Sequence, residues 1–255
     1  MDFPLDFRKL TGMTIRAYGE TDVGLKREKN EDAILLEPEM DLFVVADGMG
    51  GHKGGDLASK MAIASVKEVV ETHRTEHTFL SPRAMIEECY VEASRRIFEA
   101  SQMEDHYLQG MGTTMVVSYV HQGDIFIGNV GDSRAYLLNE KYMWQITEDH
   151  SLLNEHIKAG LIRDADAKDF QAKNIITRSV GFEREVRCDI FQRKIQPGDQ
   201  YLICSDGLSG LVSDERIHEI CTLNDIENSV KIIIQEAKKN GGDDNITVLI
   251  IEVVD

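Results

Sequence analysis

The feature that most constrains the fold is a set of short apolar runs rich in β-branched residues and bounded by Gly, Asp or Asn. Runs of this length with alternating or compact apolar residues are typical of β-strands, several of them buried. They fall in groups, and a further strand is expected just after residues 31–32. The predicted strands are Thr14–Tyr18, Leu42–Ala46, Thr114–Val120, Asp124–Val130, Tyr201–Cys204 and Ile246–Val253.

Helical periodicity is confined to blocks that lie between groups of strands. It runs from about Asp56 to Thr72, from Pro82 to Glu104 and from Asp225 to Lys239. Strands grouped in hairpins, with helices set apart, predict an α+β fold with antiparallel sheets rather than the β-α-β alternation of a parallel sheet. The 255 residues contain no repeat and no Gly/Ser-rich linker, so a single domain over 1–255 is expected.

Composition argues against several classes of function. The formal net charge of −17 repels nucleic acids and anionic lipids. The 4 cysteines form no C-x-x-C pair, so neither a zinc site nor a disulfide framework is indicated. No signal peptide is recognised, and the most apolar segment, Ile246–Val254, is too short to cross a bilayer. A soluble cytoplasmic protein with no membrane or nucleic-acid partner is expected.

Aspartate recurs beside glycine at the ends of apolar strands. One such pair is ordinary turn chemistry, but a carboxylate that ends a buried strand is costly to desolvate unless a cation meets it. Several strand ends can converge on one cleft, and oxygen ligands without a His or Cys cluster favour Mg2+, Mn2+ or Ca2+. A centre of hard cations is therefore predicted from the segments LFVVADGMGGH, FIGNVGDSR, YLICSDGLSG and KNGGDDNITVLI.

Two further residues fit the same chemistry. Gly48 follows Asp47 and lets a backbone carbonyl approach an ion with no side chain in the way. Arg27 lies shortly before the acidic residues Glu31 and Asp32. A guanidinium beside a metal–carboxylate cluster is suited to bidentate capture of a phosphoryl group, whereas a lone arginine is usually a solvated surface charge.

The ordered motifs resemble those of the bacterial branch of the type 2C (PPM) metal-dependent protein serine/threonine phosphatases. The resemblance runs from about Asp22 to Val253, and residues 1–12 are interpreted as an N-terminal extension. It implies a four-layer α-β-β-α sandwich of two antiparallel sheets flanked by helices, with metal ions at one end. The motifs are VGLKREKNED, ADGMGGH, GMGTTMVV, NVGDSRAYLL, TEDHS, LICSDGLS and GGDDNITVLI.

The resemblance also implies roles for individual residues. Asp47 corresponds to the carboxylate that bridges two ions, and Gly48 to the backbone-carbonyl ligand. Asp206 and Asp244 correspond to ligands of the first ion. Asp132 corresponds to a ligand of a weaker third ion found in the bacterial branch. The expected cofactors are therefore two Mn2+ or Mg2+ ions per site, with a third at Asp132.

Other positions concern phosphate binding and proton transfer. Arg27 corresponds to the phosphate-binding arginine, and Glu31 with Asp32 to an acidic pair that orients metal-bound waters. Where eukaryotic members have a histidine directly after Asp-Gly, this chain has Met49, which cannot donate a proton, so no general acid is assigned. His52 could assist proton transfer, but a loop histidine bonded to backbone is the commoner situation.

One segment stands apart from the sandwich. Residues 150–176 are polar, charged and weakly periodic, and they correspond to the family's flap, a helical insertion beside the active site that varies among members. Asp149 and His150, in TEDHS, are either polar neighbours of the third-ion site or the start of a helix.

The resemblance implies hydrolysis of phosphoserine and phosphothreonine in proteins. A water bridging two ions would lose a proton and attack phosphorus in line, without a covalent phosphoenzyme. Expected partners are phosphorylated proteins, a cognate serine/threonine kinase and its substrates, and the chain is expected to be a monomer. One alternative is an inactive phosphoprotein-binding regulator, against which the intact ligand set argues. The other is a metal-dependent phosphodiesterase, against which the negative charge argues.

Overall fold

The computed structural model describes residues 13–50, 54–76, 80–102, 108–163, 166, 170, 172 and 175–254. The expected N-terminal extension, 1–12, and His52 lie outside the described residues. The strands form two antiparallel sheets. The first sheet contains β1 Thr14–Asp22, β7 Arg134–Leu138, β8 Met143–Gln145, β10 Gln200–Cys204 and β11 Ile246–Val254. The second contains β2 Asp32–Glu37, β3 Leu42–Met49, β4 Gly112–Thr113, β5 Met115–His121, β6 Asp124–Val130 and β9 Asp189–Lys194.

The strand order within each sheet mixes hairpins with longer connections. The first sheet runs β1-β11-β10-β7-β8, so strands from both ends of the chain are neighbours. The second runs β2-β3-β5-β6-β9, and the short β4 pairs with β3. A tight turn joins β5 to β6, in which Gln122 and Gly123 have φ values of 50° and 86°. Positive φ at both central residues is the geometry that suits the right-handed twist of a hairpin.

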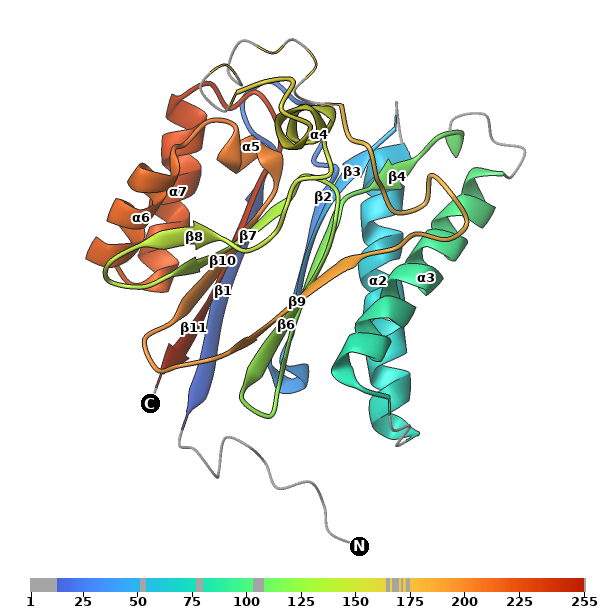
Figure 1. Ribbon diagram of the computed structural model, residues 1–255, viewed down its shortest axis with the longest axis horizontal. Coiled ribbons are helices and arrows are strands. Elements are labelled where there is room, and N and C mark those ends of the chain that lie inside the picture. Colours follow the sequence, from blue (N-terminus) through green and yellow to red (C-terminus); the bar gives the residue numbers. More distant parts are fainter. Residues whose placement is uncertain are drawn as a thin grey trace, which may run out of the picture.

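Helices cover the outer face of each sheet, which gives four layers (Figure 1). The second sheet is covered by α2 Gly54–Thr75 and α3 Pro82–Ser101. The first sheet is covered by α5 Asp206–Ser209, α6 Asp214–Leu223 and α7 Ile226–Lys239. A short 3-10 helix, η1 Pro38–Met40, links β2 to β3.

Alternation within single strands explains why the layers stack. In β11, Ile246, Val248 and Ile250 pack in the core beneath the helices, while Leu249 and Ile251 pack in the core between the sheets. Successive side chains of a strand point to opposite faces, so both faces of the sheet are buried. A strand buried on both faces is apolar along nearly its whole length, which made β11 easy to recognise.

The predicted α+β fold of two antiparallel sheets flanked by helices is confirmed. The helix expected over 82–104 ends earlier, at Ser101, and those expected over 56–72 and 225–239 correspond to α2 and α7. The predicted insertion contains one described helix, α4 Leu152–Lys158, which begins after Ser151; the Ser151 side chain accepts a hydrogen bond from Asn154 N at 3.3 Å. Among the described residues, no helix combines the length and apolar character needed to cross a membrane.

Candidate metal centre

Five aspartates lie at one end of the sandwich, where strands begin or end. Asp32 opens β2 and is the register partner of Asp47 near the end of β3. Asp132 follows β6, Asp206 follows β10 and opens α5, and Asp244 shortly precedes β11. This is the end drawn beside α4 and α5 at the top of Figure 1, opposite the C-terminus. The two sheets therefore bring together acids that are far apart in sequence.

Four of the five carboxyl groups have a raised pKa: those of Asp32, Asp47, Asp132 and Asp206. Burial raises the pKa of Asp47 well above its ordinary value, and the four other aspartates raise it further. Burial, followed by the charge of Asp206, raises the pKa of Asp132 to about 7. Burial also raises the pKa of Asp32 to about 6, against the hydrogen bonds that it accepts. Clustered, partly dehydrated carboxyl groups retain protons unless cations neutralise them, which is the electrostatic setting of a divalent-ion site.

Two buried carboxyl oxygens in this cluster have no hydrogen-bond partner: Asp32 Oδ1 and Asp132 Oδ1. The other oxygen of Asp32 is fully engaged, because Oδ2 accepts from Ser205 Oγ at 2.8 Å and from Thr247 Oγ1 at 2.6 Å. A buried oxygen left unpaired is costly, and an ion or an ordered water would satisfy it. The donor set consists of hard oxygens alone, which fits Mg2+ or Mn2+.

The backbone around Asp47 is fixed by two threonines. Thr113 Oγ1 and Thr114 N both donate to Asp47 O at 2.8 Å, and Asp47 N donates to Thr114 Oγ1 at 3.1 Å. The Thr114 hydroxyl also lies 2.7 Å from Ser133 Oγ, directly after Asp132. One buried threonine thus connects the loops that carry two of the aspartates.

Close backbone packing explains the glycine that follows Asp47. A Cβ on Gly48 would lie 2.1 Å from Gly55 O, and one on Gly55 would lie 2.8 Å from Gly48 O. Because the end of β3 and the start of α2 touch through backbone atoms, neither position has room for a side chain. The absence of a side chain at Gly48 is therefore required by packing as well as suited to a carbonyl ligand.

Arg27 lies beside the cluster. Its Nη2 donates to Asp244 Oδ2 at 2.7 Å, and 49% of the Arg27 side chain is exposed. Asp244 Oδ1 accepts from Asn245 N at 2.8 Å. The guanidinium is consequently held next to the carboxylates while about half of the side chain is exposed, which leaves it accessible to an anion.

Comparison with known proteins agrees with this geometry. The family profile described as protein phosphatase 2C matches residues 26–231. The chain belongs to the protein phosphatase 2C family. It is 37% identical over 244 residues to the serine/threonine phosphatase stp of Listeria innocua, covering 93% of this chain and 96% of that protein. It is 33% identical over 242 residues to the protein phosphatase PhpP of Streptococcus pneumoniae, covering 91% and 95%.

Solved structures of protein phosphatase 2C relatives share the fold. The Mycobacterium tuberculosis serine/threonine phosphatase PstP/Ppp superposes with a TM-score of 0.87 at 31% identity, covering 94% of this chain and 99% of that one. A catalytic domain of PstP described in complex with two manganese ions gives 0.85 at 32% identity, covering 95% and 100%. Stp1 of Staphylococcus aureus gives 0.86 at 32% identity, covering 94% and 95%.

In this protein phosphatase 2C chain the predicted metal ligands lie close together, and their carboxyl groups interact with other groups of the protein. Besides burial, the charge of Asp206 raises the pKa of Asp47, and Asp244 pairs with Arg27. Within the described ranges, no three acidic, imidazole or thiol side chains are gathered closely enough to hold an ion. Their assignment as metal ligands therefore stays a prediction, supported by charge and by unpaired oxygens.

Asp149 and His150 have structural partners. Asp149 accepts from Arg134 Nε at 2.9 Å and Nη2 at 2.7 Å, a bidentate pair. His150 Nδ1 accepts from Gly131 N at 3.0 Å, and its Nε2 lies 3.0 Å from Asp189 Oδ2. Since a backbone N–H occupies Nδ1, the proton of the neutral ring is on Nε2. His150 thus joins the Asp132 loop to β9.

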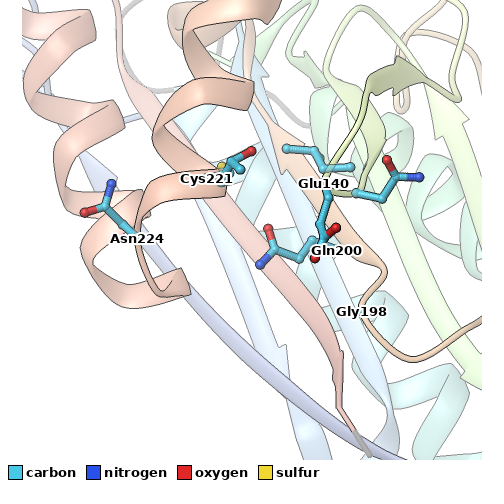
Figure 2. Close-up of a pocket in the computed structure, with 8 residues that line it drawn as sticks. Glu140, Gly198, Gln200, Cys221 and Asn224 are labelled. Carbon is cyan, nitrogen blue, oxygen red and sulfur yellow. The ribbon is translucent and has the colours of Figure 1, made fainter.

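A separate cavity of about 170 Å³ lies at the opposite end of the first sheet. Figure 2 shows Gln200, at the start of β10, with Cys221 and Asn224 from the end of α6 and beyond it. Asp206 lies past the other end of β10, so this cavity is not part of the carboxylate cluster. Its lining contains one carboxylate, Glu140, and it does not resemble a metal site.

Sequence reasoning did not assign roles to several residues that support the cluster. Their motifs, GMGTTMVV, LICSDGLS and GGDDNITVLI, were identified, but the hydroxyl and amide groups within them were given no role. Their function depends on hydrogen bonds to distant segments, which a linear pattern does not reveal. The residues are Thr113, Thr114, Ser205, Asn245 and Thr247.

Proposed function

We propose that this protein is a metal-dependent serine/threonine phosphatase that hydrolyses phosphoserine and phosphothreonine esters in proteins. The observation that carries the proposal is the gathering of five aspartates at one end of the sandwich, four of which have a raised carboxyl pKa, next to a half-exposed arginine. The named relatives are serine/threonine phosphatases, and one related structure holds two manganese ions.

Asp47, Asp206, Asp244 and the carbonyl of Gly48 would hold two Mn2+ or Mg2+ ions. When bound, these ions supply positive charge that neutralises the carboxylates and activates water for attack on phosphorus. A third ion at Asp132 is supported by its buried, unpaired Oδ1.

The chain's own residues bind and orient the substrate. Arg27 exchanges Asp244 for the phosphoryl oxygens, which accept hydrogen bonds from its guanidinium as charge shifts during the reaction. Asp32, fixed through Oδ2 by Ser205 and Thr247, directs its free Oδ1 toward water in the site. Met49 cannot donate a proton, so the serine or threonine alkoxide takes its proton from solvent or from another acid that is not yet assigned.

The physiological setting follows from the family. Phosphorylated proteins are the substrates, and a cognate serine/threonine kinase shares them. A monomer in the cytoplasm is the simplest state for such an enzyme, and the charge of −17 disfavours nucleic-acid ligands.

The proposal is tested by comparing two esters under the same conditions with Mn2+. A phosphothreonine peptide should be hydrolysed with a kcat/KM at least about 100-fold above that of bis(4-nitrophenyl) phosphate, because the site binds a dianionic monoester through Arg27. The reverse preference would identify a phosphodiesterase. Absence of both activities with Mn2+ bound would identify a phosphoprotein-binding regulator.

A further inference from the structure

Asn245 follows Asp244 and precedes β11, and only 4% of its surface is exposed. Its side-chain amide makes three hydrogen bonds to one backbone segment. Oδ1 accepts from Glu31 N at 2.8 Å, while Nδ2 donates to Val23 O at 3.0 Å and to Lys29 O at 2.9 Å. The partners are one N–H and two carbonyls, so they fix the orientation of the amide.

These bonds are made on both sides of Arg27 in the sequence. Val23 precedes Arg27, and Lys29 and Glu31 follow it, in a stretch that is neither helix nor strand. Such a stretch has no ladder of backbone hydrogen bonds to hold it, and ordering it costs conformational entropy. The amide of Asn245 therefore supplies hydrogen bonds of the kind that secondary structure would otherwise provide to the segment that carries Arg27.

The segment makes other contacts as well, some of them buried at its end and some of them exposed. Glu31 O accepts from Gly48 N at 3.2 Å and from Ser59 Oγ at 2.6 Å. Leu25 N donates to Gly242 O at 2.8 Å, and Lys26 pairs with Asp243, but both of these side chains are more than half exposed in the ion pair. Exposed ion pairs contribute little to stability, because solvent screens them. The Asn245 amide differs from these contacts because one buried side chain bonds the segment on both sides of Arg27.

Asn245 itself is rigidly placed. Its backbone N–H donates to Asp244 Oδ1, and its carbonyl oxygen would lie 1.9 Å from a Cβ on Gly207. The backbone at Asn245 is thus packed against the Asp206–Gly207 turn. Because its backbone is fixed, the side chain of Asn245 can hold residues 23–31 at a constant position relative to the carboxylate cluster.

We infer that Asn245 is a positioning residue for Arg27. By its hydrogen bonds to residues 23–31, Asn245 holds Arg27 at the phosphoryl site. The inference rests on the proposed function, in which Arg27 binds the phosphoryl group. It predicts that the side chain of Asn245 acts through Arg27 and not through the ions.

A double-mutant cycle tests this. Wild type, Asn245→Ala, Arg27→Ala and the double variant are compared by kcat and KM on a phosphothreonine peptide with saturating Mn2+. We expect Asn245→Ala to lower kcat/KM about tenfold or more, and the double variant to lie within about threefold of Arg27→Ala alone. Losses that multiply in the double variant would overturn the inference, because two residues that act separately show additive free energies.

Metal affinity supplies a second readout. Mn2+ binding, followed by electron paramagnetic resonance of the free ion, should have a Kd within about threefold of wild type in Asn245→Ala, because the backbone bond to Asp244 is retained. A weakening of Mn2+ binding that accounts for the lost activity would assign Asn245 to the support of Asp244 and overturn the inference.

Controls separate positioning from folding. Asn224→Ala also removes one amide bond, from Nδ2 to Ile220 O at 2.8 Å, and should leave kcat/KM unchanged. If Asn245→Ala does not fold, Asn245→Asp keeps the shape and the acceptor for Glu31 N but loses both donors. Failure of both variants to fold would make Asn245 a folding residue and reject the positioning role. A wild-type protein without phosphatase activity would reject the proposed function instead.

Discussion

At the scale of single residues, the pairing of Arg27 with Asp244 places a cation beside the carboxylate cluster. Both side chains are partly exposed, at 49% and 35%, so their ion pair adds little to the free energy of unfolding. The ion pair instead places the guanidinium beside the carboxylates. Because the pair is weak, the guanidinium can transfer its hydrogen bonds to an anion with a small loss of free energy. We therefore expect Arg27 to contribute to substrate binding and to the transition state rather than to stability.

Arg27→Ala should lower kcat/KM for a phosphothreonine peptide by about 100-fold or more, because a charged donor to the phosphoryl oxygens is lost. The free energy of unfolding should change by less than about 1 kcal/mol. Arg27→Lys should recover only part of the activity, since an ammonium cannot bind two oxygens with a planar fork. Steady-state kinetics and urea unfolding measure both quantities. A destabilised variant with normal kcat/KM would contradict this role.

At the scale of elements, the close approach of α3 to the second sheet sets the packing of that side of the sandwich. The approach occurs at Gly128 in β6, where a Cβ would lie 2.7 Å from both Ile86 and the ring of Tyr90. Tyr90 is fully buried and donates from its hydroxyl to Met115 O at 2.8 Å. The ring therefore has no free space into which it could move.

Gly128→Ala should destabilise the protein by about 1–3 kcal/mol through overpacking, even though alanine is otherwise preferred to glycine in a strand. Thermal or urea unfolding would show a lower midpoint. An unchanged or higher midpoint would show that α3 can shift away from β6, contrary to the tight packing described above.

The elements differ in how far the sequence predicted them. Most strands buried on both faces and the three longest helices were predicted, because their apolar periodicity is continuous. The buried strand β7 and the helix α6 were not predicted. β8 has three residues and β9, DIFQRK, is an edge strand with exposed residues on one face, so neither carries a strong pattern. The aspartates of the cluster were predicted from strand-end Asp-Gly pairs. The supporting amide and hydroxyls were not, because their partners lie far away in sequence.

At the scale of the whole molecule, the carboxylate cluster makes stability depend on pH and on cations. Below pH 3.8 these groups are protonated in both the folded and unfolded chain. As the pH rises, the unfolded chain loses protons first, because the folded pKa values of Asp32 and Asp132 are raised to about 6 and about 7. The ion-free protein therefore loses stability from these groups between about pH 4 and pH 7.

Divalent cations should reverse that loss. The increase in Tm on adding Mn2+ should be larger at about pH 7.5 than at about pH 5.5, because binding must displace protons at the lower pH. Differential scanning fluorimetry with matched sodium chloride as the salt control measures the effect. An equal Tm increase at both pH values would argue against coordination by carboxyl groups with raised pKa.

The organisation of 1–255 as one domain stays a prediction.

The central claim is that the aspartate cluster holds the ions that make this protein a phosphatase. It is tested most directly by phosphate release from a phosphothreonine peptide with Mn2+, with EDTA, and with the Asp206→Asn variant. Asp225→Asn is the matched control, because Asp225 caps α7 outside the cluster and asparagine caps equally well. We predict release by wild type and Asp225→Asn, and its loss with EDTA and with Asp206→Asn. Undiminished release under either of the last two conditions would contradict the account.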